Sequence, residues 1–160
     1  MVLSPEAAET IRRKKTRYCR YLDTKQWASL STIILPDAEI EFLDAEGQTA
    51  VDENGVEQKW NSLEGFVGYF EPVFAGMQTL HVVDPGDFEV DEENGAGNVD
   101  ETKAVFGFVY HAGNAGSEKG VHLTGGGHYY ETWRRDKDGD GEWYLAKMRL
   151  HRLFWKVANI

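Results

Sequence analysis

Residues 18–27 of this chain read YCRYLDTKQW and place a carboxylate, Asp23, where one apolar helix ends and a second short helix begins. An acid at this joint contributes little to packing between helices, since carboxylates are rarely buried without a partner. It is well placed, however, to face a cavity beneath the helix. Asp23 is therefore a candidate proton-handling group, and the segments around it decide what it faces.

The segment before this stretch predicts a long first helix. Ser4 followed by Pro5 is typical of an N-cap and a first helical position, where proline needs no amide hydrogen. Ile11, Tyr18 and Leu22 fall within about 40° of one another at roughly 100° per residue, so they form one buried stripe. The helix is thus expected to start at Ser4 and to present one apolar face.

Two further helices are expected after it. Thr24 is a candidate N-cap for a short helix that carries Trp27 and Leu30. Ser62 is a candidate N-cap for a third helix, which has aromatic side chains on one face and ends near Gly76. All three predicted helices lie in the first half of the chain.

The other segments predict strands. Residues 38–43 alternate acidic and apolar side chains, the period-two pattern of a half-buried strand. The clearest hairpin turns at residues 136–141. The predicted strands span residues 38–43, 79–83, 88–92, 104–111, 127–134 and 143–155. Helices followed by mostly antiparallel strands indicate an α+β domain in which a curved sheet wraps over the helices.

Size and charge exclude several classes of protein. At 160 residues the chain fits a single domain covering 1–160, large enough to bury its own core. No apolar run approaches the roughly 18 residues of a membrane span, and a net charge of -10 disfavours nucleic acid and anionic lipid surfaces. With Cys19 as the only cysteine and no visible secretory signal, the chain is expected to be cytoplasmic.

One basic cluster, Arg12-Arg13-Lys14-Lys15, interrupts this acidic composition. The cluster is a single short patch within the first predicted helix. We interpret it as the solvated side of that helix and expect no nucleic-acid partner.

No metal or other cofactor is expected. The 5 histidines lack the short helical spacing of a zinc motif. Residues 136–141 imitate the start of a calcium loop, but Lys147 stands where a bidentate Glu is needed, so a solvated hairpin turn is the preferred interpretation. Residues 125–127, three glycines, precede a strand and not a helix, which indicates a bend or bulge instead of a phosphate cradle.

Polar side chains inside predicted strands are the remaining candidates for a site. His81 lies among apolar neighbours, so its imidazole faces either a packed interior or a cavity. His128 and Tyr130 share one face of their strand, and Lys147 and Arg149 share one face of the next. These polar rows face either solvent or a wet pocket, and solvent is favoured for the row of Lys147.

The stretch 18–27, the tripeptide 36–38, His81 and the aromatic run 129–135 before Trp143 together resemble the SnoaL-like families of the nuclear transport factor 2-like superfamily. The resemblance covers most of the chain. It implies a cone-shaped barrel, in which a strongly curved antiparallel sheet packs on three N-terminal helices and a ligand pocket opens at the wide end. Fold alone does not settle function in such a superfamily.

Similarity to the dehydratases of this superfamily, scytalone dehydratase and bile acid 7α-dehydratase, implies roles for individual residues. An Asp at the end of the first helix pairs with a His on the first strand after the third helix in those enzymes, and Asp23 and His81 occupy these places. Tyr18 matches a phenol of the bile acid enzyme. The expected substrate-binding residues are Phe42, Phe70, His111, His128, Tyr130 and Arg149. Leu22 and Phe42 stand where scytalone dehydratase has tyrosines, which argues against that substrate.

The expected function is therefore a cofactor-free dehydratase or isomerase. In it, neutral His81, oriented by Asp23, removes a proton from a carbon beside a carbonyl. The resemblance implies a hydrophobic, polycyclic or aromatic substrate, such as a polyketide or steroid, and a homodimer. Two alternatives stay open: a ligand-binding or dimerisation module without catalysis, and an accessory subunit of a ring-hydroxylating dioxygenase.

Overall fold

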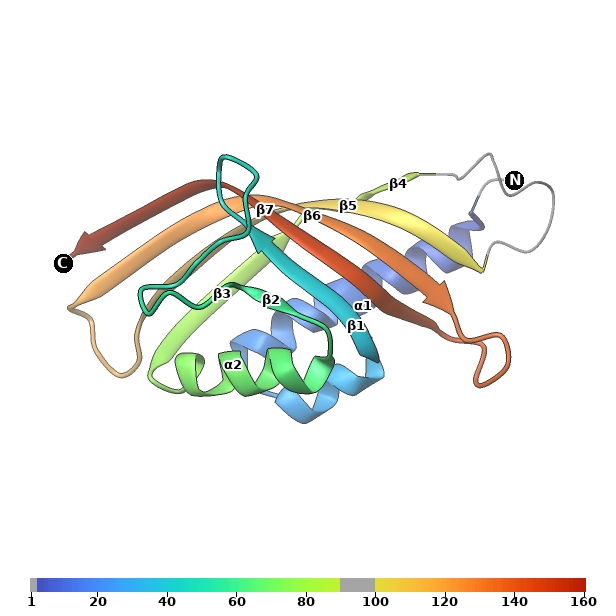
Figure 1. Ribbon diagram of the computed structural model, residues 1–160, viewed down its shortest axis with the longest axis horizontal. Coiled ribbons are helices and arrows are strands. Elements are labelled where there is room, and N and C mark those ends of the chain that lie inside the picture. The colour runs from blue at the N-terminus through green and yellow to red at the C-terminus, as the bar shows by residue number, and fades with distance from the viewer. Residues whose placement is uncertain (1–2, 90–99) are drawn as a thin grey trace.

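The computed structural model describes residues 3–89 and 100–160, in which an open, curved sheet arches over the helices (Figure 1). The helices are α1 (Pro5–Asp23), the 3-10 helix η1 (Trp27–Thr32) and α2 (Leu63–Ala75). The strands are β1 (Ile34–Leu43), β2 (Lys59–Trp60), β3 (Met77–Val83), β4 (Asp87–Glu89), β5 (Glu101–Asn114), β6 (Val121–Arg135) and β7 (Trp143–Asn159).

The sheet has the order β2-β1-β7-β6-β5-β3, and β4 pairs with β5. Strands β5, β6 and β7 form a long antiparallel meander, whereas β1 and β7 run parallel. The predicted α+β class with a curved sheet on N-terminal helices is confirmed. The sheet is mixed, however, and not wholly antiparallel as expected. The first strand, β1, pairs with β7, the last strand of the meander, and these two strands run in the same direction.

The helix caps agree with the sequence at two of three positions. Ser4 accepts a hydrogen bond from the amide of Ala7 at 3.1 Å, and Ser62 accepts one from Gly65 at 3.0 Å. The prediction that Thr24 caps the second helix is wrong. Its hydroxyl donates to the carbonyl of Arg20 at 2.6 Å, so Thr24 closes α1 instead of opening η1.

The core lies between the helices and the concave face of the sheet. Helix α1 contributes Ile11 and Tyr18, and α2 contributes Phe66. The sheet contributes the large side chains of β5, β6 and β7 that point the same way, among them Tyr129 and Trp133. Alternation along each strand thus separates one concave, buried face from one convex face.

The basic cluster of α1 is not the solvated face that the sequence predicts. Lys14 and Lys15 are buried, and the ammonium of Lys14 donates to the carbonyl of Trp143 at 2.5 Å. Four consecutive helical residues point in four directions at roughly 100° per residue, so a run of like charges cannot occupy one face. Of the four, Arg13 alone is exposed, whereas Arg12 is half-buried.

Two weaker strand and turn predictions have definite outcomes. The strand expected at 88–92 overlaps β4 at Phe88 and Glu89, and residues 90–92 of that prediction lie outside the described part of the chain. Residues 136–141 form the turn between β6 and β7, as predicted. Within residues 3–89 and 100–160, no helix is long and apolar enough to cross a membrane.

The three glycines at the middle of β6 let two backbones approach closely. The pairing of β6 with β7 shifts register between Gly126 and Gly127, which confirms the predicted bulge. A Cβ at Gly127 would overlap the carbonyl oxygen of His151, which belongs to the backbone and cannot move aside. Glycine is therefore required at the point where β6 and β7 bend over the helices.

We predict that Gly127→Ala destabilises the fold by about 3 kcal/mol, because the new methyl group forces the two strands apart. Gly68→Ala in α2 is the matched control, since a Cβ there meets nothing within 4 Å and alanine favours the helix by up to about 1 kcal/mol. Urea unfolding monitored by tryptophan fluorescence measures both. Equal stability of the two variants would contradict the required close approach.

Candidate active site

A cavity of about 220 Å³ lies between α1, α2 and the concave face of the sheet. Its wall is mostly aromatic, with the rings of Phe42, Phe66, Phe70, Phe74, Phe108 and Tyr110. Tyr18 and His81 also line it. Phe42 and Phe70, expected from the sequence as substrate-binding residues, are therefore wall residues of this cavity.

His81 and Asp23 are in direct contact at one side of the cavity. The ring nitrogen Nδ1 of His81 lies 2.6 Å from Oδ1 of Asp23, and the His81 amide donates to Oδ2 at 2.9 Å. Thr79 donates its hydroxyl to Oδ1 at 2.9 Å. Because an ionised carboxylate only accepts hydrogen bonds, Nδ1 carries a proton and Nε2 of a neutral ring keeps its lone pair.

The contact is shielded from water. The side chains of His81 and Asp23 are 8% and 11% exposed. Burial alone would raise the pKa of Asp23, but hydrogen bonds from the His81 ring and amide outweigh it and hold that pKa below its ordinary value. Asp23 is therefore a stable anion beside the imidazole.

The imidazole is held in one plane by neighbouring rings. Tyr110 stacks on it with ring centroids 5.3 Å apart and planes inclined by 15°, and Phe74 stacks at 6.5 Å. Gly125 makes room for Tyr110, since a Cβ there would lie 2.5 Å from the tyrosine ring. The orientation of His81 thus depends on a glycine in the middle of β6.

Four phenols line the cavity, and one of them, Tyr69, donates its hydroxyl to Asp52 at 2.7 Å, which leaves Tyr18, Tyr110 and Tyr129 as candidate donors to a ligand. Burial raises the pKa values of Tyr18 and Tyr129 well above the ordinary range, and the two rings pack edge to face. Burial also raises the pKa of Tyr110 to about 12, although the charge of Arg152 acts in the opposite direction. All three phenols therefore keep their protons at neutral pH.

Two buried polar atoms of the described chain lack a hydrogen-bond partner, and both belong to residues of the cavity wall. They are Nε of Arg152, a donor, and Oε1 of Gln58, an acceptor. The guanidinium carbon of Arg152 lies 4.0 Å from the centroid of the Trp155 ring, which shields one of its faces. Buried polar groups without partners are costly, so these two atoms are ready to bind polar groups of a ligand.

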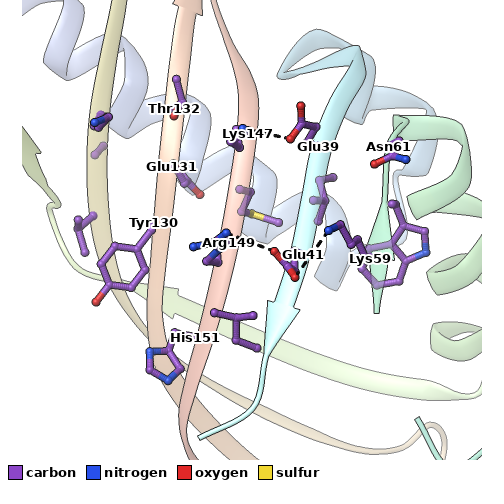
Figure 2. Close-up of a pocket in the computed structure, with 17 residues that line it drawn as sticks. Glu39, Glu41, Lys59, Asn61, Tyr130, Glu131, Thr132, Lys147, Arg149 and His151 are labelled. Carbon is purple, nitrogen blue, oxygen red and sulfur yellow. Dashed lines mark ion pairs between the residues drawn. The ribbon is translucent and has the colours of Figure 1, made fainter. Parts of the chain in front are cut away.

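Four residues predicted as substrate-binding lie on the opposite, convex face of the sheet. Tyr130 and Arg149 border an outer hollow beside β1, where Arg149 is 3.5 Å from Glu41 (Figure 2). His128 lies beside Tyr130, and His111 contacts His122 and Thr124. These four residues do not line the aromatic cavity, because side chains alternate along a strand and Tyr129 takes the inward position between His128 and Tyr130.

Tyr18 and Asp23 serve the same site without sharing one helical face. They diverge by about 140° around an ideal helix, and α1 stays regular through Asp23. Tyr18 lines the cavity directly, whereas the Asp23 carboxylate meets β3 from behind His81. The imidazole of His81 therefore lies between the Asp23 carboxylate at the end of α1 and the cavity.

Sequence reasoning missed Tyr110, Tyr129, Arg152 and Gln58. A signal for Tyr129 was present, since it lies an even number of positions from the buried Trp133. Arg152 has a similar signal, since it lies two positions after Leu150 and four after Met148, which are both buried. Among the described residues, no group of three or more His, Cys, Asp or Glu side chains could hold a metal ion.

Known proteins are similar to this chain in both sequence and fold. The sequence matches the model of the SnoaL-like domain over residues 4–149. A probable cyclase of Gibberella zeae is 41% identical over 160 residues, covering 100% of both chains. A putative scytalone dehydratase from Novosphingobium aromaticivorans superposes with a TM-score of 0.68 at 14% identity, over 95% of this chain and 87% of that one. The β subunit of a putative aromatic-ring-hydroxylating dioxygenase from the same organism gives 0.66 at 16% identity, over 94% and 91%.

A curved sheet that closes an aromatic cavity against N-terminal helices defines the nuclear transport factor 2-like class of α+β domains. Within that class the chain belongs to the SnoaL-like family.

The lowered pKa of Asp23 predicts how the contact contributes to stability. A carboxyl group whose pKa falls on folding stabilises the native state above its ordinary pKa of 3.8, and this contribution is lost as the pH falls through the lowered value. We expect the melting temperatures of the unaltered chain and Asp23→Asn to differ near pH 6 and to converge below about pH 3. Thermal unfolding followed by circular dichroism measures the difference.

Asp84→Asn is the control for this comparison, since Asp84 is an exposed carboxylate beyond the end of β3. Its melting temperature should stay close to that of the unaltered chain near pH 6. A constant gap between Asp23→Asn and the unaltered chain down to pH 3 contradicts a stabilising ionised contact.

Proposed function

We propose that this chain is a cofactor-free enzyme that moves protons on a compact, hydrophobic, carbonyl-bearing ring compound, with His81 as general base and Asp23 as the group that orients it. The observation that carries this proposal is the 2.6 Å contact between Nδ1 of His81 and the Asp23 carboxylate at the wall of an aromatic cavity. A carboxylate on one nitrogen leaves the other basic and stabilises the imidazolium that forms.

The first step is removal of a proton from a carbon next to a carbonyl. Nε2 of His81 takes the proton, the electron pair of the broken C–H bond forms a C–C double bond, and the carbonyl oxygen receives the negative charge. The resulting imidazolium stays paired with Asp23, which offsets the charge that burial would otherwise disfavour.

The enolate oxygen needs hydrogen-bond donors in a site that excludes water. Tyr18 and Tyr129 form a phenol pair at the wall, and the unpartnered Nε of Arg152 is a further donor. Donors fixed before the reaction stabilise developing negative charge better than water, because they need no reorganisation.

The enolate can then follow three routes with the same groups. The imidazolium returns its proton to a leaving hydroxyl, which departs as water, or to another carbon, which isomerises the double bond. In the third route the enolate carbon attacks a second carbonyl of the same molecule and the imidazolium protonates the new alkoxide, which closes a ring. The relative from Gibberella zeae is named a probable cyclase, which favours the third route.

The cavity supports a compact apolar substrate. Its volume of about 220 Å³ is below the roughly 300–1,000 Å³ of pockets that hold drug-sized ligands. The wall is mainly aromatic, so flat ring systems of the polyketide or steroid kind fit its chemistry, and small members of those classes fit its size. The two polar atoms of Arg152 and Gln58 favour a substrate with both an acceptor and a donor oxygen.

The position of Asp23 also favours a catalytic role over a structural one. An anion at the C-terminal end of a helix faces the negative end of the helix dipole and loses about 0.3–1 kcal/mol there. A module that only binds ligands, or an accessory subunit of a dioxygenase, has no use for an imidazole oriented at such a cost.

We predict that His81→Ala slows exchange of the acidic carbon-bound protons of beta-tetralone in heavy water by about 100- to 10,000-fold, because it removes the base. Asp23→Asn should cause a smaller loss, since Asn orients the ring without stabilising its charge. Proton NMR of the ketone follows the exchange.

His128→Ala is the matched control, because His128 lies on the convex face of the sheet beside Tyr130. It should exchange the probe at the rate of the unaltered chain. Full exchange by both His81→Ala and Asp23→Asn would reject the dyad and leave the binding module as the better interpretation.

Arg152 and Arg149 give a second matched pair on the same strand. We predict that Arg152→Met weakens binding of para-nitrophenolate, a mimic of an enolate, by about 10-fold, as expected for the loss of one charged hydrogen bond. Arg149→Met should bind the probe normally, since Arg149 pairs with Glu41 on the convex face. Calorimetric titration measures both, and the reverse order of effects contradicts the assignment of Arg152 to the cavity.

A further inference from the structure

A buried ion pair lies directly behind the phenols of the cavity. The ammonium of Lys15 contacts Oε1 of Glu131, and the two side chains are 1% and 0% exposed. Trp133 donates its indole N–H to Oε2 of Glu131 at 2.8 Å. Neither Lys15 nor Glu131 lines the cavity, and neither takes part in the proposed proton transfer.

The ammonium also lies over the faces of the two phenol rings. Its nitrogen is 3.3 Å from the centroid of the Tyr129 ring and 4.2 Å from that of Tyr18. These rings meet edge to face with centroids 6.1 Å apart. One cation therefore touches both members of the phenol pair, and it does so from the side away from the cavity.

The placement of both partners follows from local periodicity. Lys15 lies one helical turn before Tyr18 on α1, so their side chains are neighbours. Glu131 lies two positions after Tyr129 on β6, so both point to the concave face. A pair joining these neighbours fixes the helix and the strand at the level of the phenols.

Stability alone does not account for a pair of this kind. Removing two charges from water is costly, and well-packed uncharged residues in place of a buried pair are often as stable or more so. A cation over an aromatic face, on the other hand, is attracted to the negative potential of that face. It also restricts the rotation of the ring.

We propose that the Lys15–Glu131 pair is a positioning device that holds Tyr18 and Tyr129 together as one hydrogen-bonding unit for an oxyanion. This inference rests on the proposed function, because it gives the phenols the task of binding the enolate oxygen. Lys15 and Glu131 act through the phenols and touch no ligand.

The test replaces both charges at once. In the double variant Lys15→Met with Glu131→Gln, the methionine keeps the length of the lysine, and the glutamine keeps an acceptor for Trp133. The net charge of the protein is unchanged, so any effect on an anion is local. A single substitution is less useful, because it would leave one buried charge without a partner.

The probes are para-nitrophenolate, which carries an oxyanion, and para-nitroanisole, a neutral molecule of similar shape. We expect the double variant to bind the phenolate about 10-fold more weakly, as for one charge-assisted hydrogen bond that loses its geometry, and the anisole within about 2-fold of the unaltered chain. Calorimetric titration and the absorbance maximum of the bound phenolate report the change.

Lys14→Met is the matched control. Lys14 is also a buried lysine of α1, but its ammonium contacts the carbonyl of Trp143 and the ring of Tyr144, away from the cavity. It should leave the affinities for both probes unchanged. Unchanged phenolate binding in the double variant, or an equal loss for both probes, overturns the proposal.

The outcome is separable from that of the proposed function. Phenolate binding involves no carbon-bound proton, so it does not depend on His81 acting as a base. If the double variant binds both probes normally while His81→Ala still abolishes ketone exchange, the positioning role is wrong and the proton-transfer function stands. If phenolate selectivity falls while exchange never depends on His81, the phenol pair binds oxyanions in a site that is not catalytic.

Discussion

The carboxylate of Asp23 is the point on which the fold and the site both depend. It accepts hydrogen bonds from the ring and the amide of His81 and from the hydroxyl of Thr79. These three bonds tie the end of α1 to β3, an edge strand of the main sheet path. The same bonds fix the tautomer of the imidazole, so the contact that closes the cavity also prepares the group that faces it.

The concave and convex faces of the sheet have different chemistry, and glycines in β6 maintain the separation. Gly125 lets Tyr110 lie flat against the strand, where it stacks on His81. Gly127 lets β6 and β7 approach closely at a bulge that follows Arg152 on β7, and Arg152 faces the cavity with Leu150 two positions before it. The absence of a side chain at Gly125 therefore decides where the Tyr110 phenol lies at the cavity wall, and the glycine at 127 permits the close approach of the two strands.

Charge inside this acidic protein is concentrated in a few closed arrangements. Asp23 is anionic beside His81, and Lys15 pairs with Glu131 behind the phenols. Each buried charge has a partner, as the cost of burial demands. Arg152 differs, since its Nε is buried without an acceptor at the cavity wall, where we propose that a ligand oxygen completes the pairing.

The sequence by itself determined the local features: the caps at Ser4 and Ser62, the order of helices and strands, and the acid at the end of the first helix. Spacing and resemblance together also identified Asp23, His81 and Tyr18 as candidates for one site. Only the tertiary structure decided which polar residues face the cavity. It turned His128 and Arg149 outward and Tyr129 and Arg152 inward. Alternation separates neighbouring side chains onto the two faces of a strand, but the packing of the sheet on the helices decides which face is buried, and local sequence does not encode that packing.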